Sequence, residues 1–538
     1  MPGARRLDRQ VLLALLVAAA VLLPRAALIS RAHSETYDEE YHLSRGARFW
    51  SRSLAEVPLN DPPLGEALAA LPLVLANRAP GWTGGLYDHS RSPESALLLT
   101  HLWMSLLFLP AIGVAFAWCR RLYGLPSAWL AVVLLLVEPT FASHAPLAAL
   151  DTIGMSGALV ASFLVWRLFE RPSASRLVAA SAATACALML KHTTLGLCAV
   201  WAGEAVLVWI VRPLLRRQGW PGQQGVWRSR LLAVAATVLI GALTLWALTL
   251  FDVSRPRPRD DWGRVTAVVP SWLQRPVPGG LYLTALLQGI EHAEQGHSAF
   301  LLGERRATGW WYYFPAVLLY KMPLGILLCL GVASASLLWR RPGWEEWGLL
   351  VPLLTWGGLA LTGSINIGLR HFLPTYVFML LLATRSLYAA KPPGAAWLVW
   401  GGVVLAAVHG ATYHPDYLSY LNLPRERPWM AISDSNLDWG QGLKQARAWL
   451  ERRGIPPERP VHLLYFGDDS SGRRIRHHLG ERVTYALRPG PLPAHGLIIA
   501  SPVWVAGPYD PRGRYAALRA LQPIDVIGHS MLVYDLDE

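Results

Sequence analysis

Charged side chains are scarce in this sequence. Asp, Glu, Lys and Arg make up 16% of its 538 residues, whereas 53% of the residues are hydrophobic. Soluble domains usually carry about 25% charged residues. The apolar residues form long blocks separated by short charged connections, which is typical of a polytopic membrane protein. The composition therefore argues against a soluble globular protein.

Cysteine is scarce as well, with four residues at Cys119, Cys186, Cys198 and Cys329. All four lie in or at the edge of apolar blocks, and their spacing is not that of metal ligands. We therefore expect neither a disulfide framework nor a cysteine metal site. The sequence also lacks an internal repeat and a low-complexity tract.

Acidic residues are outnumbered, because 49 Lys and Arg stand against 36 Asp and Glu, for a net charge of +13. Such a charge first suggests nucleic acid as a partner. Much of it, however, lies in short clusters between apolar blocks, as the positive-inside rule describes. We therefore predict a membrane protein without a nucleic-acid partner.

The apolar blocks predict about eleven membrane-spanning helices, most of them near the ~20 residues that cross a bilayer. The predicted spans are residues 11–29, 97–119, 127–143, 150–169, 176–190, 193–211, 231–251, 313–338, 346–362, 372–389 and 395–412. No small-residue cleavage site follows the first block, so we interpret it as a retained anchor rather than a signal peptide.

The connections predict an orientation with the N-terminus in the cytoplasm. Every inner connection is then basic; they carry Arg5 and Arg6, Arg120 and Arg121, Arg167 with Arg171 and Arg176, the group from Arg212 to Arg230, Arg340 and Arg341, and Arg385 with Lys391. The outer face receives the loops 30–96 and 252–312, the turn 138–151, and everything after about residue 412.

Residues 413–538 differ in character from the apolar part. The stretch "SDSNLDWGQGLKQARAWLERRG" predicts a capped helix ending at Gly454. "PVHLLYF", "HGLIIAS" and "DVIGHSMLVYDL" predict strands. We expect a membrane domain over 1–412 and an extracytoplasmic α/β domain over 413–538. The apolar part of "NDPPLGEALAALPLVLAN" is too short to span, so we expect an interfacial helix with Asp61 as its cap.

An acidic cluster, "YDEEYH", directly follows the first span. Thr36 and Glu39 have the spacing of a capping box, which offers Glu39 a structural role. Asp38 has no structural role that is equally good. We predict a catalytic role for Asp38, with Glu39 beside it. Asp151 opens a span at the outer face, where it is either a helix cap or part of a site.

Three groups of cations break the positive-inside pattern on the outer face. They are Lys191 with His192, Lys321, and Arg370 with His371. An anionic headgroup, most simply a phosphate, is their natural partner. For Lys321, snorkelling to the interface is an alternative. The combination predicts group transfer from a phosphate-linked lipid, with a carboxylate accepting the proton of an attacking hydroxyl and cations stabilising the departing phosphate.

The ordered motifs resemble a known family. "YDEEYH", "NDPPLGEALAALP", "ALDTIG", "LKHTTLG", "GWWYYFPAVLLYKMPL", "INIGLRHFLP" and "HPDYLSYLN" followed by "SDSNLDWGQGLK" are similar to the protein O-mannosyltransferase-like glycosyltransferases, family 39 with the class C fold. The likeness is greatest to the bacterial lipid-carrier-dependent branch, and the aminoarabinose transferases acting on lipid A are relatives.

The resemblance implies an inverting transfer of a hexosyl or pentosyl group from a polyprenyl-phosphate donor to an acceptor lipid, glycan or protein. It implies a location at the outer face of the bacterial cytoplasmic membrane. It implies Asp38 as base or acceptor-orienting residue, Asp151 as the second acidic position, and Lys191, Lys321 and Arg370 as ligands of the donor phosphate. Asn60-Asp61 stands where many members have His, and the tail is not a β-trefoil, so protein O-mannosylation is not implied.

Two other functions remain open from the residues. A transporter or flippase of lipid-linked sugars would carry functional charges deep in several helices and often repeat symmetry. A non-catalytic membrane scaffold would act through its C-terminal domain. No cofactor is predicted from a motif, and a divalent metal is left open because Asp38, His144 and Asp151 could approach one another in the fold.

Overall fold

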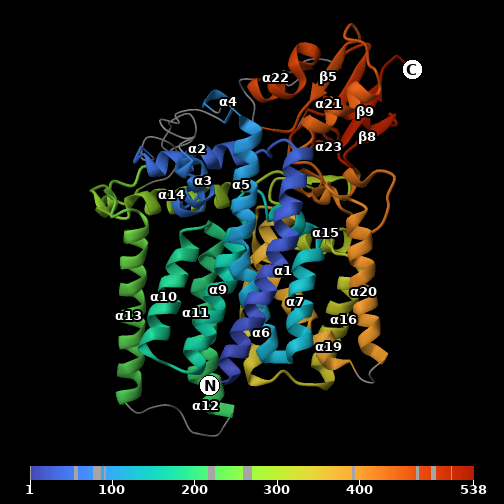
Figure 1. The fold of residues 1–538 in the computed structure, drawn as a ribbon. Helices are drawn as coiled ribbons and strands as arrows, with labels where there is room; N and C mark the ends of the chain where they lie inside the picture. Colours follow the sequence, from blue (N-terminus) through green and yellow to red (C-terminus); the bar gives the residue numbers. More distant parts are fainter. Residues whose placement is uncertain are drawn as a thin grey trace.

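The computed structural model describes residues 2–53, 59–76, 86–89, 92–215, 224–258, 269–390, 394–467, 472–485, 492–510 and 512–537. Parts of the predicted loops 30–96 and 252–312, the middle of the basic group 212–230, and Lys391 lie outside the described residues. Figure 1 shows a bundle of long helices with the N-terminus at one end and a smaller sheet-containing domain at the other.

Helical segments coincide with every predicted span. The bundle helices are α1 (Pro2–Ala32), α5 (Pro93–Leu107), α6 (Leu109–Tyr123), α7 (Leu125–Val137), α8 (Pro139–His144), α9 (Asp151–Glu170), α10 (Ala174–Leu188), α11 (Gly196–Val206), α12 (Arg212–Leu215), α13 (Gln224–Leu248), α15 (Tyr313–Lys321), α16 (Leu324–Trp339), α17 (Trp347–Thr362), α18 (Leu373–Ala383), α19 (Arg385–Ala389) and α20 (Gly394–Ala411). Several predicted spans are built from two consecutive helices, as in α5 and α6.

Among the described residues, six helical segments are long and apolar enough to cross a membrane. They are Arg9–Ala32, Pro93–Tyr123, Asp151–Glu170, His192–Leu215, Arg228–Leu248 and Leu369–Ala389. Shorter apolar helices fill the remaining positions of the bundle, so the chain is a polytopic α-helical membrane protein. The number of about eleven spans stays a prediction.

Ion pairs join the connections at the N-terminal end of the bundle. Arg121 at the end of α6 contacts Glu170 at the end of α9, and it lies 3.0 Å from Glu345 before α17. The buried Arg385 contacts Glu346 in the same region. Among the described residues, Arg121 and Arg385 therefore lie with their acidic partners at the end of the bundle opposite the sheet domain (Figure 1).

A layer of helices lies across the other end of the bundle (Figure 1). It contains α2 (Glu39–Trp50), α3 (Pro63–Leu75), α4 (Leu86–His89) and α14 (Gly280–Gln295). Helices α2 and α3 cross so closely that a Cβ on Gly46 would lie 1.9 Å from the carbonyl oxygen of Glu66. The interfacial helix expected after "NDPP" is therefore present as α3. Its N-cap is Pro62, so Asp61 lies one residue before the cap, and the expected capping role of Asp61 is wrong.

Short strands flank α14 in the segment 252–312. Strands β1 (Val253–Ser254) and β2 (Val277–Pro278) pair antiparallel, as do β3 (Ala299–Leu301) and β4 (Glu304–Arg306). These strands and α14 were not anticipated within the predicted loop 252–312.

The C-terminal part folds around a five-stranded mixed sheet of order β6-β5-β7-β9-β8. Its elements are α21 (Leu443–Arg452), β5 (Val461–Leu464), α22 (Arg473–Leu479), β6 (Thr484–Tyr485), β7 (Leu497–Ala500), α23 (Pro502–Ala506), β8 (Asp525–Ile527) and β9 (Met531–Asp535). The three predicted strand regions are present. The last is a hairpin of two strands, because Gly528 and His529 both have positive φ and form a tight turn.

Residues 413–442 connect the sheet to the bundle and pack against the membrane helices. The predicted helix from "SDSNLDWG" begins only at Leu443, and the stretch before it contains the short 3₁₀ turn Asp434–Asn436. The side chain of Asn436 accepts a hydrogen bond from the backbone of Leu369 at 3.0 Å. This irregular segment carries Trp439 to the mouth of the bundle, and the domain boundary at 412 stays a prediction.

Candidate active site

A cavity of about 440 Å³ lies between α2, α14 and the ends of the bundle helices. Its volume is within the ~300–1,000 Å³ range of small-molecule sites. Five predicted site residues line it together: Asp38, Lys191, His192, Arg370 and His371. The exceptions to the positive-inside pattern in two separate loops, at 191–192 and 370–371, therefore face the same space.

A chain of ion pairs connects the predicted acids and cations. Arg370 Nη1 lies 2.7 Å from Asp38 Oδ2 and 3.8 Å from Asp151 Oδ2. Lys191 Nζ lies 2.6 Å from Asp151 Oδ1. Asp151 is buried behind the cavity lining, so it holds both cations in place. The second oxygen of Asp151 has no hydrogen-bond partner among the described residues, and its only contact named here is the longer ion pair with Arg370.

Asp38 stands at the N-cap position of α2, yet its carboxylate makes no capping hydrogen bond. It accepts instead from Arg370, a residue 332 positions away in the sequence. The side chain is half-buried and faces the cavity. The local structure of α2 therefore does not require a carboxylate at position 38. The contact with Arg370 is what uses it.

The guanidinium of Arg370 packs over an aromatic ring. Its guanidinium carbon lies 4.0 Å from the ring centroid of Trp439. The turn before it contains Gly368 at φ +155°, where a Cβ would lie 2.2 Å from Ser435 Oγ. Only glycine permits this approach of the 433–439 segment. Arg370 Nε and His371 Nε2 are buried without hydrogen-bond partners among the described residues, so donors remain for an anionic ligand.

The backbone before Asp151 is strained. Leu150 adopts φ +62°, a conformation that costs a non-glycine residue about 1–3 kcal/mol. The preceding stretch of residues 145–150 is buried. This turn delivers Asp151 into the first turn of α9, toward Lys191 and Arg370. Asp151 is thus within the helix, and Leu150 occupies the N-cap position.

Glu39 does not line the cavity and is fully buried. One of its oxygens accepts from the backbone of Thr36 at 2.8 Å, which is the Glu39 half of the predicted capping box. The other half is absent, because the N-cap of α2 is Asp38 and the Thr36 hydroxyl donates to Glu39. The other Glu39 oxygen contacts His101 Nε2 at 2.8 Å and accepts from Ala148 N at 3.0 Å. Its contacts favour a structural role that joins α2 to α5 and to the turn before Asp151, and its catalytic role stays a prediction.

Lys321 does not line the cavity either. Its buried ammonium donates to the backbone carbonyls of Leu418 and Asn436, both at 2.6 Å. These bonds hold the connecting segment 413–442 against α15. The geometry favours this structural role over both snorkelling and phosphate binding, and the predicted ligand role of Lys321 lacks a position at the cavity.

Further cavity residues were not predicted. His42 and Asp61 line it, and α14 contributes Gln288, Glu291, His292 and Gln295. His42 follows Asp38 by four residues and so shares its helix face, a signal present in "DEEYH". The i, i+3, i+4, i+7 spacing of the α14 residues is likewise visible in "QGIEHAEQ". Asp61 was predicted to cap a helix, and its neighbouring residues gave no indication that it lines a cavity.

His42, Asp61 and Glu66 are the residues of this site that fit a divalent cation. Each offers one ligand atom, and these atoms lie within 4.8 Å of one another. Burial opposes protonation of His42, but the hydrogen bond and charge of Glu66 outweigh it and raise its pKa. Burial also opposes ionisation of Asp61, but Lys191 and His42 lower its pKa. Within the described residues, Asp38, His144 and Asp151 do not form such a group.

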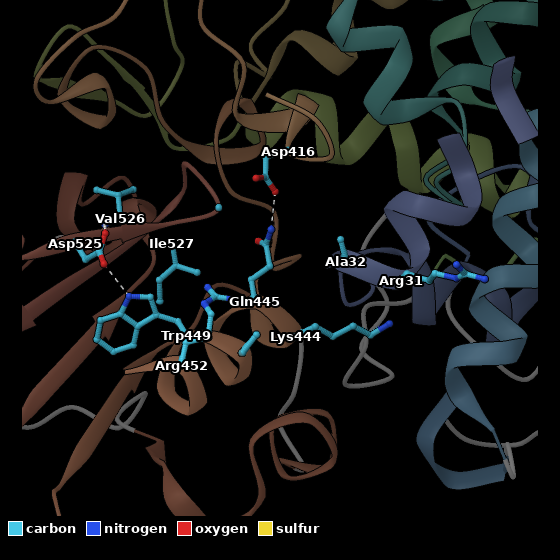
Figure 2. A pocket seen from close by; sticks show the side chains of 12 residues that line it. Arg31, Ala32, Asp416, Lys444, Gln445, Trp449, Arg452, Asp525, Val526 and Ile527 are labelled. Atoms are coloured by element: carbon cyan, nitrogen blue, oxygen red, sulfur yellow. Dashed lines mark hydrogen bonds between the residues drawn. The ribbon is translucent and has the colours of Figure 1, made fainter. Parts of the chain in front are cut away.

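A second cavity of about 490 Å³ lies between the end of α1, α21 and β8 (Figure 2). Four of its polar side chains are paired with one another. Gln445 Nε2 donates to Asp416 at 2.7 Å, and Trp449 Nε1 donates to Asp525 at 2.8 Å. It contains none of the predicted site residues, so the cavity around Arg370 is the stronger candidate for chemistry.

Solved structures with this fold are known. The crystal structure of ArnT from Cupriavidus metallidurans in the apo state matches with a TM-score of 0.50 and 12% identity, covering 98% of this chain and 97% of that chain. ArnT from the same organism bound to undecaprenyl phosphate matches with a TM-score of 0.48 and 14% identity, covering 97% of both chains. The Archaeoglobus fulgidus oligosaccharyltransferase in the apo form matches at 0.42 and 12%, over 88% of this chain and 64% of that chain.

No protein-family model matches the sequence, and no curated protein matches it. At 12% identity the likeness to ArnT shows the fold alone. The chain has the class C glycosyltransferase fold over nearly its whole length, which confirms the fold that the sequence motifs implied.

Proposed function

We propose that this protein is a membrane glycosyltransferase that moves a sugar from a polyprenyl-phosphate donor to an acceptor hydroxyl. The reaction takes place at the outer face of the bacterial cytoplasmic membrane, on the side of the bundle that carries the sheet domain. One observation carries the proposal: a carboxylate, Asp38, shares a cavity of headgroup size with two cations, Lys191 and Arg370, from separate loops. The fold shared with ArnT and the motif resemblance support it.

The cations bind the donor phosphate. Arg370 presents a planar guanidinium suited to phosphate oxygens, and Trp439 limits its movement. Lys191 adds a point charge, and Asp151 sets the distance between the two cations. His192 and His371 line the same wall. This arrangement stabilises negative charge as it develops on the departing phosphate.

Asp38 acts on the acceptor. The acceptor oxygen attacks the anomeric carbon, the carbon–oxygen bond to the phosphate breaks, and its electron pair leaves with the phosphate. The Asp38 carboxylate takes the hydroxyl proton. A single displacement inverts the anomeric configuration. In the ligand-free site Arg370 neutralises Asp38 at 2.7 Å, so donor binding draws Arg370 toward the phosphate and releases the carboxylate to act as a base.

A divalent cation bound by His42, Asp61 and Glu66 would supply further positive charge beside the phosphate. Arg45 and Lys191 face the same acids, so the site also has cations of its own. The roles of Asp38, Lys191 and Arg370 described above do not depend on that ion.

Transfer from labelled polyprenyl-phosphate sugars by the purified protein tests the proposal. We expect Asp38→Asn to reduce kcat by about 10²–10⁴-fold, the usual contribution of a general base. Arg370→Ala should raise the KM for the donor. Glu304→Gln and Arg306→Ala are matched controls, because this exposed pair lies on the same outer side, with its nitrogen and oxygen 3.4 Å apart.

Mass spectrometry of surface lipids, glycans and proteins, with and without this chain, identifies the acceptor and sugar. Full transfer by Asp38→Asn would refute the base assignment. Movement of the lipid-linked sugar across proteoliposomes without any transfer would favour a flippase. If cells lacking the chain keep both sugar transfer and movement of the lipid-linked sugar across the membrane, a scaffold role would be favoured.

A further inference from the structure

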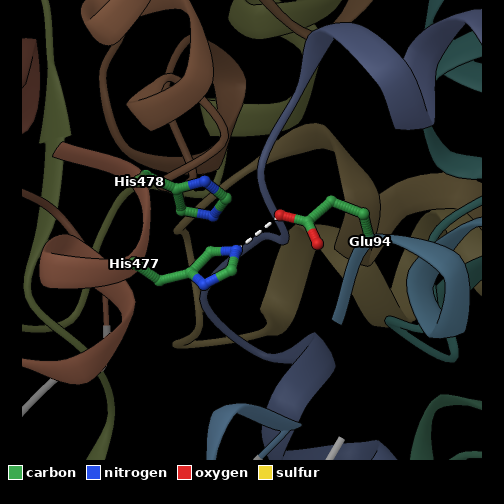
Figure 3. A group of neighbouring side chains, drawn as sticks. All are labelled: Glu94, His477 and His478. Carbon is green, nitrogen blue, oxygen red and sulfur yellow. Dashed lines mark hydrogen bonds and ion pairs between the residues drawn. The ribbon is translucent and has the colours of Figure 1, made fainter. Parts of the chain in front are cut away.

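A second group of metal-ligand side chains lies outside the cavity, where the C-terminal domain meets the membrane domain. Glu94 is in the first turn of α5, and His477 and His478 are on α22 (Figure 3). We propose that these three residues bind a zinc-type divalent cation that ties the two domains together. This site is independent of the proposed transfer reaction.

The donor atoms already converge. One nitrogen from each imidazole and one carboxylate oxygen all lie within 4.8 Å of one another, and Glu94 Oε1 is 2.5 Å from His477 Nε2. Tetrahedral zinc with bonds of about 2.0–2.1 Å places its ligands roughly 3.4 Å apart. Zinc binding would require rotations of the three side chains from this spacing to that of a tetrahedral site. Two His and one Glu are a common zinc ligand set, with water in the fourth position.

His477 and His478 are adjacent residues of α22. Here the ring centroids of His477 and His478 lie 4.9 Å apart, and both rings face α5. Glu94 meets them across a sequence separation of 383 residues. The convergence is produced by domain docking and not by the helix alone.

The surroundings hold the ligands and admit the ion. His478 Nε2 lies 2.9 Å from the hydroxyl of Tyr87, which donates to Glu35 at 2.5 Å. Such outer contacts orient ligating imidazoles in metal sites. Glu94 and His477 are exposed, and a cavity of about 520 Å³ borders Glu94 and His478.

Neighbouring cations have partners of their own. Arg474 contacts Glu35 and Glu40, at 2.5 Å and 2.9 Å. Lys444 donates to a backbone carbonyl at 2.9 Å, and Arg447 pairs with a glutamate on its own helix. None of these three cations is therefore paired with the carboxylate of Glu94, which contacts His477. A metal ion here would link α22, the helix that carries Arg474, to α5, and so stabilise the docked C-terminal domain.

The test uses the full-length protein in detergent after treatment with a chelator. We expect elemental analysis of the washed protein after zinc titration to find one more ion per chain in the wild type than in Glu94→Gln or His477→Ala. The same titration should raise the melting temperature of the wild type by several degrees. Both variants alter exposed side chains, so they should fold, while their zinc affinity falls by about 100-fold or more and the zinc-dependent shift disappears.

His495→Ala is the matched control, because His495 is exposed in the same domain and outside the group. It should retain the wild-type affinity. Asp61→Asn separates the group around His42 from this one. Unchanged zinc binding in both Glu94→Gln and His477→Ala would overturn the proposal, as would zinc binding lost only in Asp61→Asn.

Discussion

Arg474→Met should loosen the docking of the C-terminal domain. Arg474 on α22 is fully buried, and its Nε lies 2.5 Å from Glu35 Oε1. A second nitrogen lies 2.9 Å from Glu40 Oε2. Both glutamates flank Asp38, so one arginine of the sheet domain holds the loop that carries the proposed base. Methionine keeps much of the volume and removes the charge.

The magnitude follows from the charge state of Glu35. Burial opposes ionisation of Glu35, but Arg474, His478 and Tyr87 outweigh it and lower its pKa from 4.5 to about 2. A difference of this size corresponds to about 3 kcal/mol of stability. Breaking a buried ion pair by removing one partner costs roughly 3–5 kcal/mol, which agrees. We therefore expect a loss of about 3 kcal/mol in Arg474→Met.

The pH dependence has a definite sign. Because the pKa of Glu35 is depressed in the folded protein, its stabilisation is present above about pH 4.5 and is lost as the pH falls toward 2. The wild type should lose docking stability across that window. In Arg474→Met the loss across the same window should be smaller, because the largest cationic partner is already gone.

Amide hydrogen exchange of the full-length protein in detergent measures the effect by segment. A loss of about 3 kcal/mol accelerates exchange about 100-fold in α2 and α22 when exchange proceeds through undocking. Arg476→Met is the matched control, because Arg476 is an exposed arginine on the same helix. Equal exchange in the two variants would refute the reasoning, as would an unchanged pH dependence in Arg474→Met.

Three further substitutions test separate contacts. Lys321→Met should lower the free energy of unfolding by about 1–3 kcal/mol through two unsatisfied carbonyls, while the donor KM measured at low temperature stays unchanged; a raised KM without destabilisation would restore the phosphate-binding role. Gly46→Ala should lower the melting temperature through about 1–3 kcal/mol of overpacking, whereas Gly358→Ala, with open space around it, should not. Trp439→Leu should raise the donor KM about tenfold with a smaller change in kcat, because it removes the ring under Arg370; equal losses in both constants would contradict this.

The fold was largely predictable because membrane helices depend on local composition. Apolar blocks of about 20 residues must satisfy their backbone hydrogen bonds internally, so length and hydropathy indicate them directly. The breaks within them were harder to predict. The separation of α15 from α16 falls at Met322-Pro323, and α14 was missed because a half-buried helix in a loop has no long apolar run.

The site was partly predictable from violations of the charge rule. Lys191 and Arg370 could be singled out because cations beside apolar segments are costly, and no local role offsets that cost. Lys321 was singled out by the same violation of the charge rule, yet its ammonium donates to two backbone carbonyls of the connecting segment. Sequence distinguishes an unusual charge from an ordinary one. It does not show whether the partner of that charge is a ligand or the protein's own backbone.

By itself the sequence predicted the membrane bundle, the basic connections on one side of it, and Asp38 as an acid without a local structural purpose. Those properties depend on short-range physics: hydropathy, charge and helix capping. Only the tertiary structure decided that Arg370 reaches Asp38 across 332 positions, that Trp439 supports it, and that Arg474 clamps the first loop. Such contacts depend on the packing of distant segments, which no local pattern records.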